Sequence, residues 1–296
     1  MGEALGIVGA GRMAQAMGQL LRQRGVPIAG VTSRNPSHAR EAARFIGPGV
    51  EALDSVRQLL LRCDTLLIAV SDDAVSRVAE VLADVGMSKG VAIHTAGVHG
   101  PQALRPLAER GVSCGSLHPL QTVSTPEQGV SSLPEAWYAV AAEGRAAEVA
   151  RAWVSLLGGR LLSINSNGKP LYHAAAVMAS NGTIALLSAA VELMQAAGVT
   201  PDRALQALAP LVSASLENAL SQGPTAALTG PVERGDARTI GLHQAAMDAA
   251  RMAEEIRDLY LAAGLQAARM AAVKGLDPDR VRAVRRALKG AVDEAR

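Results

Sequence analysis

The feature that most constrains this chain is a glycine-rich turn near its start, GAGRMA at Gly9–Ala14. It matches the pattern G-x-G-x-x-A and follows the apolar run Leu5–Val8, which is typical of a short strand. The first glycine permits a tight turn, the second lets a pyrophosphate approach the backbone, and the small sixth residue lets helix and strand pack closely. The pattern therefore predicts a dinucleotide-binding turn that leads into a helix over Met13–Arg24. The alternative is a tight strand-to-helix turn without a ligand. The predicted cofactor contacts in this turn are Gly9, Ala10, Gly11, Arg12 and Met13.

Short apolar runs alternate with helix-like segments through the first half of the chain. One of them, Thr65–Val70 (TLLIAV), is continuously apolar, as expected of a strand covered on both faces. Strands separated by helices imply βαβ units and a mostly parallel sheet. The predicted strands are Leu5–Val8, Ile28–Thr32, Thr65–Val70, Val91–Thr95, Val112–Leu117, Trp137–Ala142 and Arg160–Ile164.

After Asn165 the sequence predicts helices only. The segment NSNG at Asn165–Gly168 is typical of a junction between domains. We therefore predict an α/β fold, with a doubly wound parallel Rossmann domain over 1–166 followed by an all-α domain over 167–296. The predicted helices are Pro170–Ala197, Pro201–Gln222, Ala237–Ala263 and two shorter ones that end near Glu294.

The residues after the second predicted strand bear on the choice of nicotinamide cofactor. NAD sites usually place Asp or Glu there, but this chain has Thr32-Ser33-Arg34-Asn35. A hydroxyl and a guanidinium suit a 2′-phosphate, which favours NADP(H) over NAD(H), although Arg34 also fits an ordinary surface charge.

Ligands of a parallel sheet gather beyond the carboxyl ends of its strands, and this rule predicts further contacts. His118 follows a later strand and is either a substrate contact or a structural loop histidine. The further predicted cofactor contacts are Ser33, Arg34, Ser71, Asp72, Thr95, Ala96 and Gly97.

The composition argues against several other classes of protein. The net charge is +2 with scattered basic residues, so there is no concentrated patch for nucleic acid. No run reaches the roughly 18 uncharged apolar residues of a membrane span, and we interpret the Ala-rich Ala174–Ala190 as a buried helix. The N-terminus lacks the pattern of a signal peptide. Cys63 and Cys114 have no metal-ligand spacing, which predicts two reduced thiols in a cytoplasmic protein.

The whole chain resembles the 6-phosphogluconate dehydrogenase-like superfamily, and four motifs carry a closer resemblance to one group within it. They are GIVGAGRMA, SLHPLQT, the K-x-x-x-H of KPLYH with ASN after it, and ALTGPVERGD at Ala227–Asp236. That superfamily joins a Rossmann domain to a C-terminal helical domain, and includes ketopantoate reductase, pyrroline-5-carboxylate reductase and the β-hydroxyacid dehydrogenases. More closely, nearly the whole chain resembles a bacterial group of Rossmann-like proteins whose helical domain is of unknown function.

The resemblance implies a catalytic lysine at the start of the first long helix after the Rossmann domain. In ketopantoate reductase and the β-hydroxyacid dehydrogenases this lysine binds or protonates the substrate oxygen, and an asparagine one turn later orients the substrate. Lys169 matches the lysine by position, whereas His173 stands in place of the asparagine. Pyrroline-5-carboxylate reductase usually lacks the lysine and has a Thr-rich glycine loop, which differs from the loop here around Arg234 and Asp236.

Helical geometry refines this picture. At roughly 100° per residue, Lys169 and His173 lie about 40° apart on successive turns, and Tyr172 points about 60° to the other side. Ser180 returns to the bearing of Lys169 roughly 16 Å further along, too far to reach the same small substrate without help, so it is a secondary position that either lines the substrate or lies in an interface. Because Pro170 follows it, Lys169 is predicted to be extended, beside a positive helix end that lowers a lysine pKa.

The hypothesised reaction is hydride transfer from NADPH to the carbonyl of a small, ketopantoate-like 2-oxo acid held between the domains. Lys169, with His173, would protonate the oxygen, and Arg234 would hold a carboxylate. The alternatives are an imine reductase of the pyrroline-5-carboxylate type and a non-catalytic NADP(H) sensor. Ala-rich segments at Leu186–Ala197 and Ala245–Ala272 predict a homodimer through the helical domain. The predicted substrate contacts are His118, Ser180, Asn181, Arg234 and Asp236.

Overall fold

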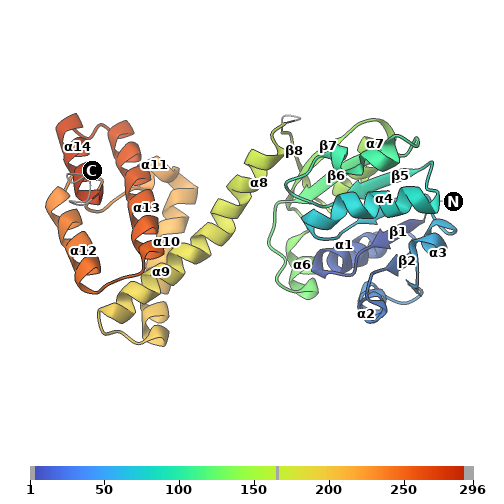
Figure 1. Cartoon of the computed structure of the whole chain (residues 1–296), viewed down its shortest axis with the longest axis horizontal. Helices are drawn as coiled ribbons and strands as arrows, with labels where there is room; N and C mark the ends of the chain where they lie inside the picture. Colours follow the sequence, from blue (N-terminus) through green and yellow to red (C-terminus); the bar gives the residue numbers. More distant parts are fainter. Residues whose placement is uncertain (1–3, 165–166, 290–296) are drawn as a thin grey trace. The chain divides into compact units, whose positions relative to one another are not determined.

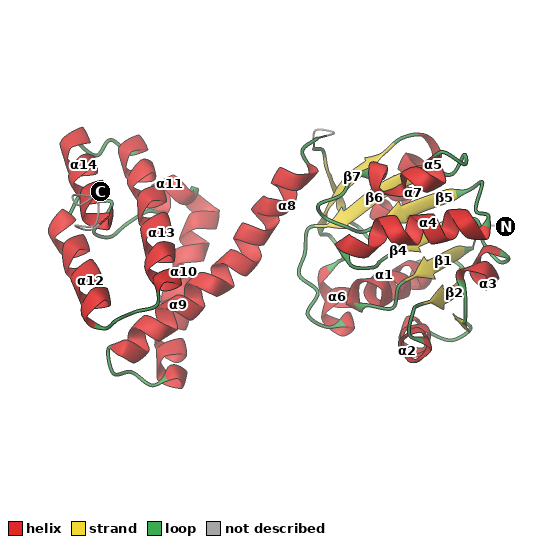
Figure 2. Cartoon of the chain, viewed as in Figure 1, coloured by secondary structure: helices red, strands yellow, loops and turns green. Residues whose placement is uncertain are grey.

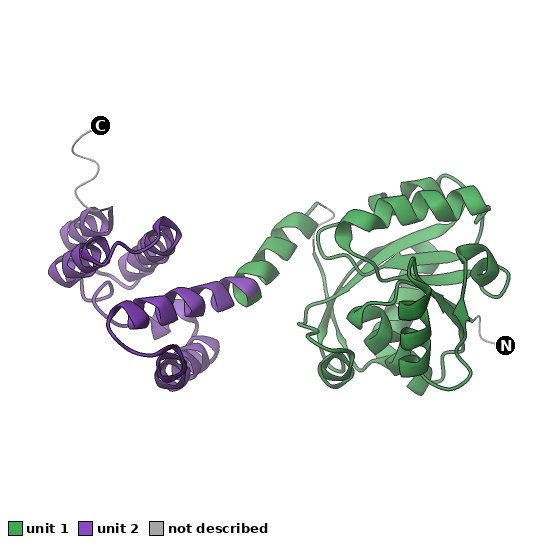
Figure 3. Cartoon of the chain, turned by 60° about the horizontal axis from the view of Figure 1, so that its bottom comes forward, with its two compact units in different colours: residues 1–180 green, residues 181–296 purple. Residues whose placement is uncertain are grey.

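The computed structural model describes residues 4–164 and 167–289. The chain forms two compact units, residues 1–180 and 181–296, which Figure 3 colours separately. The predicted boundary at 166 borders residues 165–166, which lie outside the described residues. The division falls later, inside a helix, because α8 (Lys169–Val177) bonds to groups of the first unit.

An eight-stranded sheet forms the centre of the first unit, in the order β3-β2-β1-β4-β5-β6-β7-β8. All neighbouring strands are parallel except β6 and β7, which are antiparallel. Every residue of β1, β4 and β5 is buried, as expected of strands with helices on both faces (Figure 1). The predicted doubly wound, mostly parallel sheet is therefore confirmed. The strands are β1 (Leu5–Val8), β2 (Ile28–Thr32), β3 (Ala52–Leu53), β4 (Thr65–Ile68), β5 (Val91–His94), β6 (Ser113–Pro119), β7 (Trp137–Ala142) and β8 (Arg160–Leu162).

Two hydrophobic cores lie on the two faces of this sheet. Helices α1, α2 and α7 contribute to one core, and α3, α4 and α5 to the other. Trp153 of α7 is buried in the first core, whereas Trp137 of β7 is 45% exposed, with the Arg160 guanidinium 5.8 Å from its ring. The helices are α1 (Arg12–Gln23), α2 (Pro36–Ile46), α3 (Val56–Leu60), α4 (Val75–Val85), α5 (Arg105–Ala108), α6 (Pro126–Ser132) and α7 (Gly144–Leu156), with 3₁₀ turns at Asp72–Ala74 and Pro101–Leu104.

The described residues of the second unit form helices and loops only (Figure 2). Its core is a cluster around Ile240, Ala268, Val284 and Leu288, where α12, α13 and α14 meet. The prediction of a single helix over Ala237–Ala263 is wrong. One helix ends at Ala249 and the next begins at Glu254, and between them Arg251 adopts a left-handed φ of 50°. The helices are α9 (Thr183–Ala196), α10 (Pro201–Gln222), α11 (Pro224–Ala227), α12 (Ala237–Ala249), α13 (Glu254–Val273) and α14 (Pro278–Lys289), and the predicted end near Glu294 lies outside the described residues.

The long helix Pro170–Ala197 predicted after the junction differs from expectation in two ways. A π-helical segment, Met178–Gly182, separates α8 from α9, so the straight-helix bearings predicted beyond Val177 do not apply. The helical run Lys169–Ala196 is also mostly exposed, with only 6% of its most apolar 18-residue window buried. The expectation of a buried helix was therefore wrong for the single chain.

By length and composition this 28-residue run could cross a bilayer, since its mean hydropathy reaches 1.6. Large apolar side chains on it are exposed, among them Leu171 (79%), Met178 (76%) and Ile184 (67%). The same surface suits a helix that another protein chain covers.

Candidate active site

The glycine turn has the geometry that the sequence predicts. Gly9 has a φ of +115°, and a Cβ there would lie 2.1 Å from the Ala69 carbonyl oxygen, so only glycine fits. A Cβ on Gly11 would meet no atom within 4 Å, and Ala14 is fully buried behind the turn. The first N–H groups of α1 have no partner within the helix and lie beside this open space, which is the arrangement that a pyrophosphate requires.

The Arg12 side chain holds another loop. Its Nη1 donates to the Ser124 carbonyl at 3.0 Å, which fastens the segment after β6 to the start of α1. Gln15 also bonds back to the turn, through the Ala10 carbonyl at 2.9 Å. Arg12 and Met13 therefore offer a ligand their backbone N–H groups, while the Arg12 guanidinium is engaged elsewhere.

Arg34, in the loop after β2, has an acidic neighbour that the sequence pattern did not indicate, the Asp73 carboxyl. Arg34 is exposed, and Asn35 caps α2 by accepting from the Ser37 N–H at 2.9 Å. The Ser71 hydroxyl lowers the pKa of the Asp73 carboxyl by hydrogen bonding, and the Arg34 guanidinium adds to the lowering. The predicted cofactor residues Arg34 and Ser71 thus share a carboxylate, which comes from the loop after β4.

His94, the last residue of β5, organises the next loop and was not predicted. It is fully buried, its Nδ1 accepts from the Ala96 N–H at 3.2 Å, and its Nε2 lies 3.0 Å from the Gly100 carbonyl oxygen. A ring nitrogen that faces an N–H must accept and one that faces a carbonyl must donate, so His94 is neutral with its proton on Nε2. The pKa of His94 is lowered to about 4, mainly by burial.

Lys169 lies against this loop, and its side chain is almost completely buried, at 1% exposed. Its Nζ donates to the Ala96 carbonyl at 3.5 Å and lies 5.7 Å from the centre of the Tyr172 ring. Burial lowers the pKa of Lys169 to about 8, and the nearby Asp72 carboxylate partly offsets that effect. Lys169 is the first residue of α8, so the extended conformation expected before Pro170 was wrong.

His118 of β6 contacts two side chains of α8, Tyr172 and His173. Its Nδ1 lies 2.7 Å from the Tyr172 hydroxyl, and the His173 ring packs edge-on against it with centroids 5.9 Å apart. Burial lowers the pKa of His118 to about 3, and the charge of Lys169 contributes to the lowering. The predicted residues Lys169, His173 and His118 therefore form one cluster, together with Tyr172.

Gly97, in the loop after β5, lies directly against the two histidine rings of this cluster. A Cβ there would lie 2.3 Å from His173 Nδ1 and 2.9 Å from His118 Nε2. The two ring nitrogens therefore face the same small space, and His173 Nδ1 is buried without a hydrogen-bond partner. Among the described residues, no group of three or more His, Cys, Asp or Glu side chains could hold a metal ion.

Comparison with known families accounts for both halves of the chain. A model of a Rossmann-like domain matches residues 3–119, and a model of a domain of unknown function, DUF2520, matches residues 136–267. The chain joins a Rossmann-like domain to a DUF2520 domain. This confirms the family resemblance carried by the four motifs. No curated protein matches the sequence.

Solved structures share the fold over almost the whole chain. Protein TM1727 from Thermotoga maritima has a TM-score of 0.69 at 21% identity, over 92% of this chain and 99% of its own. A reductive aminase from Aspergillus terreus, in complex with NADPH and ethyl-5-oxohexanoate, has a TM-score of 0.66 at 19% identity, over 96% and 99%. An imine reductase variant from Myxococcus stipitatus, in complex with NAD⁺, has a TM-score of 0.59 at 16% identity, over 97% and 100%.

The remaining predicted substrate residues all lie within the DUF2520 match. Ser180 and Asn181 fall within the π-helical segment. Asp236 caps α12, accepting from the Thr239 N–H at 3.0 Å and from its hydroxyl at 2.6 Å. Arg234 lines a cavity of about 470 Å³ in the second unit, together with Lys274 and other side chains. Their role as substrate contacts stays a prediction.

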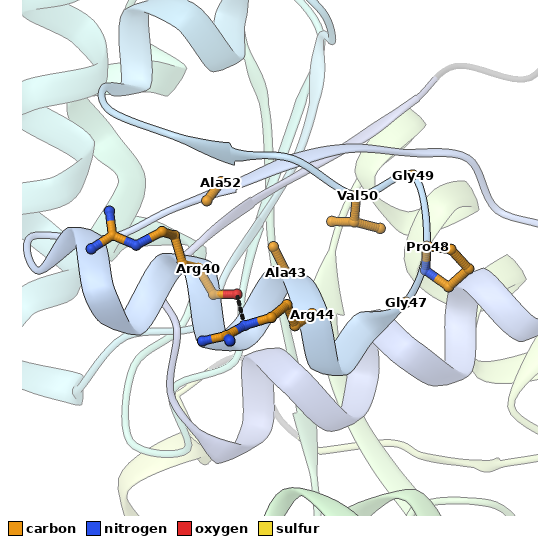
Figure 4. A pocket seen from close by; sticks show the side chains of 8 residues that line it. All are labelled: Arg40, Ala43, Arg44, Gly47, Pro48, Gly49, Val50 and Ala52. Carbon is orange, nitrogen blue, oxygen red and sulfur yellow. Dashed lines mark hydrogen bonds between the residues drawn. The ribbon is translucent and has the colours of Figure 1, made fainter.

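The cavity of about 580 Å³ shown in Figure 4 is unrelated to this chemistry. It lies at the C-terminal end of α2, between Arg40, Arg44 and the loop Gly47–Val50. That loop leads into the start of β3, so the cavity lies at the amino edge of the sheet, opposite the edge where ligands of parallel sheets bind.

Proposed function

We propose that the protein is an NADPH-dependent oxidoreductase that reduces the carbonyl of a small 2-oxo acid of the ketopantoate type. The observation that carries the proposal is the buried amine of Lys169, with its pKa lowered to about 8, at the carboxyl edge of a sheet with a dinucleotide-binding turn. A proton donor is most effective when its pKa lies near the working pH, and burial brings Lys169 there.

NADP(H), when bound, supplies the hydride chemistry. The glycine turn and the first N–H groups of α1 would hold the pyrophosphate, and Ser33 with Arg34 would hold the 2′-phosphate. The reductive aminase with the same fold, which is in complex with NADPH, supports this choice. NAD(H) is the less favoured cofactor. The feature in its favour is the Asp73 carboxyl near Arg34, because NAD sites use a carboxylate to hold the ribose hydroxyls.

The chain's own contribution to the reaction is the handling of the proton and the charge. Lys169 is protonated at neutral pH and would give a proton to the oxygen as negative charge develops on it, then regain one from solvent. The Ala96 carbonyl fixes the position of the amine, and His94 fixes the Ala96 backbone. His173 presents an unpaired Nδ1 beside this position.

The charge of the site favours a carbonyl over an imine. Lys169 carries the positive charge of the cluster, because His94 and His118, with pKa values lowered to about 4 and about 3, are neutral at pH 7, and the nearby Asp72 carboxylate offsets that charge only in part. A protonated imine would be repelled by this ammonium group, whereas the carboxylate of a 2-oxo acid would be attracted.

The test is steady-state NADPH oxidation with ketopantoate and other small 2-oxo acids. Lys169→Met should lower kcat/KM about 10³-fold through the loss of the proton donor, and its matched control, the exposed Lys89→Met, should change it less than twofold. Equal rates for wild type and Lys169→Met would remove Lys169 from the mechanism.

Imine reduction is the second candidate, favoured by the fold shared with a reductive aminase and an imine reductase. The same assay with Δ1-pyrroline-5-carboxylate and other cyclic imines decides between the two candidates. A kcat/KM that is higher for the imines than for the 2-oxo acids would identify an imine reductase. Tight NADPH binding with no turnover of either panel would indicate a non-catalytic sensor.

We also propose that the working form is a cytoplasmic homodimer that covers the exposed run Lys169–Ala196 with a second copy. The exposed Leu171, Met178 and Ile184 support this, since apolar patches of this kind mark interaction surfaces. Light scattering after size-exclusion chromatography should give a dimer for wild type and a monomer for Ile184→Glu. A wild-type monomer that partitions onto lipid vesicles would replace the second copy with a membrane.

A further inference from the structure

The hydrogen bond between His118 and Tyr172 determines where the His118 ring carries its proton. A phenol can donate to a ring nitrogen or accept from it, and the 2.7 Å contact to Nδ1 allows either. Burial raises the pKa of Tyr172 to about 12, so its hydroxyl keeps its proton. No other acceptor among the described residues contacts this hydroxyl, so its proton is best satisfied on His118 Nδ1.

When Nδ1 accepts, the proton of the neutral ring must sit on Nε2. This Nε2 has no partner of its own among the described residues, and it faces the space beside Gly97. Adding a Cβ to Gly97 would bring an atom within 2.9 Å of Nε2, which shows how little separates the ring from the loop. The ring thus presents an N–H to the same space that His173 Nδ1 faces.

The surroundings keep the ring uncharged. The titratable and charged groups that face it are Lys169 and His173 on α8 and His94 on β5, with Asp72 near Lys169. Burial has the largest effect on the pKa of His118, and the positive charge of Lys169 acts in the same direction. A neutral imidazole donates a hydrogen bond without giving up its proton, so it complements Lys169 and does not duplicate it.

We infer that neutral His118 donates its Nε2–H to the carbonyl oxygen of the substrate, and that Tyr172 holds it in this tautomer. The inference rests on the proposed reductase function. Bound NADPH would supply the hydride that forms the new C–H bond and would leave as NADP⁺, the C=O π pair would move to the oxygen, and that oxygen would take the proton of Lys169. His118 ends the step unchanged. It is a catalytic residue, and Tyr172 is a positioning residue.

The first experiment reads the tautomer without any turnover. Histidine in the full-length protein is labelled with ¹⁵N, and two-bond ¹H–¹⁵N correlations are recorded, with His118 assigned by its loss in His118→Gln. The inference expects a protonated Nε2 and a bare Nδ1 at pH 7, and a mixture of tautomers in Tyr172→Phe. A proton on Nδ1 in the wild-type protein would overturn it. Because the measurement needs no substrate, it stands even if no 2-oxo acid is reduced.

The second experiment tests donation in the reaction. His118→Ala should lower kcat about 100-fold, as removal of one oxyanion donor does, whereas the amide N–H of His118→Gln should restore much of that loss. Tyr172→Phe should lower kcat about tenfold with little change in the KM for NADPH. A second contact of the same kind, His243 Nδ1 to the Tyr260 hydroxyl at 2.7 Å in the second unit, provides matched controls, since Tyr260→Phe and His243→Gln should leave kcat unchanged. Equal kcat values for His118→Ala and His118→Gln would remove the donor role.

Discussion

Two histidine–tyrosine pairs of nearly identical geometry occur in the two units. In the first unit, His118 Nδ1 lies 2.7 Å from the Tyr172 hydroxyl, with ring centroids 5.5 Å apart and planes at 85°. In the second unit, His243 Nδ1 lies 2.7 Å from the Tyr260 hydroxyl, at 5.9 Å and 82°. Both residues of the first pair are partly buried beside Lys169, whereas in the second pair Tyr260 is partly buried and His243 is exposed. The two pairs therefore share one contact and differ in the groups that surround it, so any difference in their behaviour reports on the surroundings.

The largest expected difference between the two pairs is in how much folding stability depends on each histidine at acidic pH. The folded pKa values of His118 and His94, about 3 and about 4, lie below the unfolded value of 6.5, so the unfolded chain binds more protons between these limits. The stability that each neutral histidine contributes is complete above pH 6.5 and is lost as the pH falls. At pH 5 the loss is about 2 kcal/mol for each residue.

Urea unfolding between pH 7 and pH 5 measures this effect. His118→Gln should decline less than wild type, and His243→Gln should decline as wild type does. If His118→Gln lost as much stability as wild type between pH 7 and pH 5, the pKa of His118 would not be lowered by its surroundings.

The charge beside the buried pair should be costly to the fold. Lys169 has one weak acceptor for its ammonium, the Ala96 carbonyl, so Lys169→Met should raise the free energy of unfolding by about 1 to 3 kcal/mol while it removes activity. The folded pKa of about 8 lies below the unfolded value of 10.5. Wild-type stability should therefore rise between pH 8 and pH 10.5, because the folded state releases its proton first.

Thermal unfolding across this pH range tests the prediction, with Lys89→Met as the control. The rise should be absent in Lys169→Met and present in Lys89→Met. A less stable Lys169→Met would mean that the amine is better solvated or paired than its burial indicates.

The backbone beneath each pair offers a third comparison. Gly97→Ala would push a methyl group against His173 and His118, and should lower the free energy of unfolding by about 1 to 2 kcal/mol. Gly241, two residues before His243 in α12, has no atom within 4 Å of a would-be Cβ. Gly241→Ala should therefore be neutral or stabilise by up to about 1 kcal/mol. Equal effects in denaturant titrations would show that the loop at Gly97 can move aside.

The smallest effect concerns the phenol groups themselves. Tyr172→Phe should lower the free energy of unfolding by about 1 kcal/mol, because the ring nitrogen left behind is partly buried. Tyr260→Phe should lower it by only a few tenths, since water can bond to the nitrogen of the exposed His243 that the hydroxyl leaves behind. Chemical denaturation of both variants measures the difference, and similar losses would mean that burial hardly strengthens the contact.

The parts of the fold that repeat a simple pattern were predictable from the sequence. Continuous apolar runs indicate strands covered on both faces, and Gly9 with Gly11 indicates the turn that the structure shows. The antiparallel pairing of β6 and β7 was not predictable, because strand direction leaves no trace in an apolar pattern. The π-helical segment was missed although MASNG at Met178–Gly182 ends in a glycine, because a poor helix former inside a helical pattern weakens the helix without indicating which irregularity replaces it.

The candidate site was only half predictable. His118 was predicted from its position after a strand, whereas Lys169 was predicted from the family resemblance and not from the pattern alone. Tyr172 was set aside because its Cα bearing differs from that of Lys169 by about 60°, but a tyrosine side chain is long enough to bridge that angle. His94 was passed over as the last residue of an apolar strand, where its ring bonds to a loop that the sequence pattern does not describe.

The placement of the aromatic residues also supplies a built-in optical probe. Trp137 and Trp153 are the two tryptophans of the chain, and both belong to the first unit. Intrinsic fluorescence therefore reports on the Rossmann-like unit, while far-ultraviolet circular dichroism also records the helices of the second. A gap between the two signals during unfolding would reveal that the units melt separately.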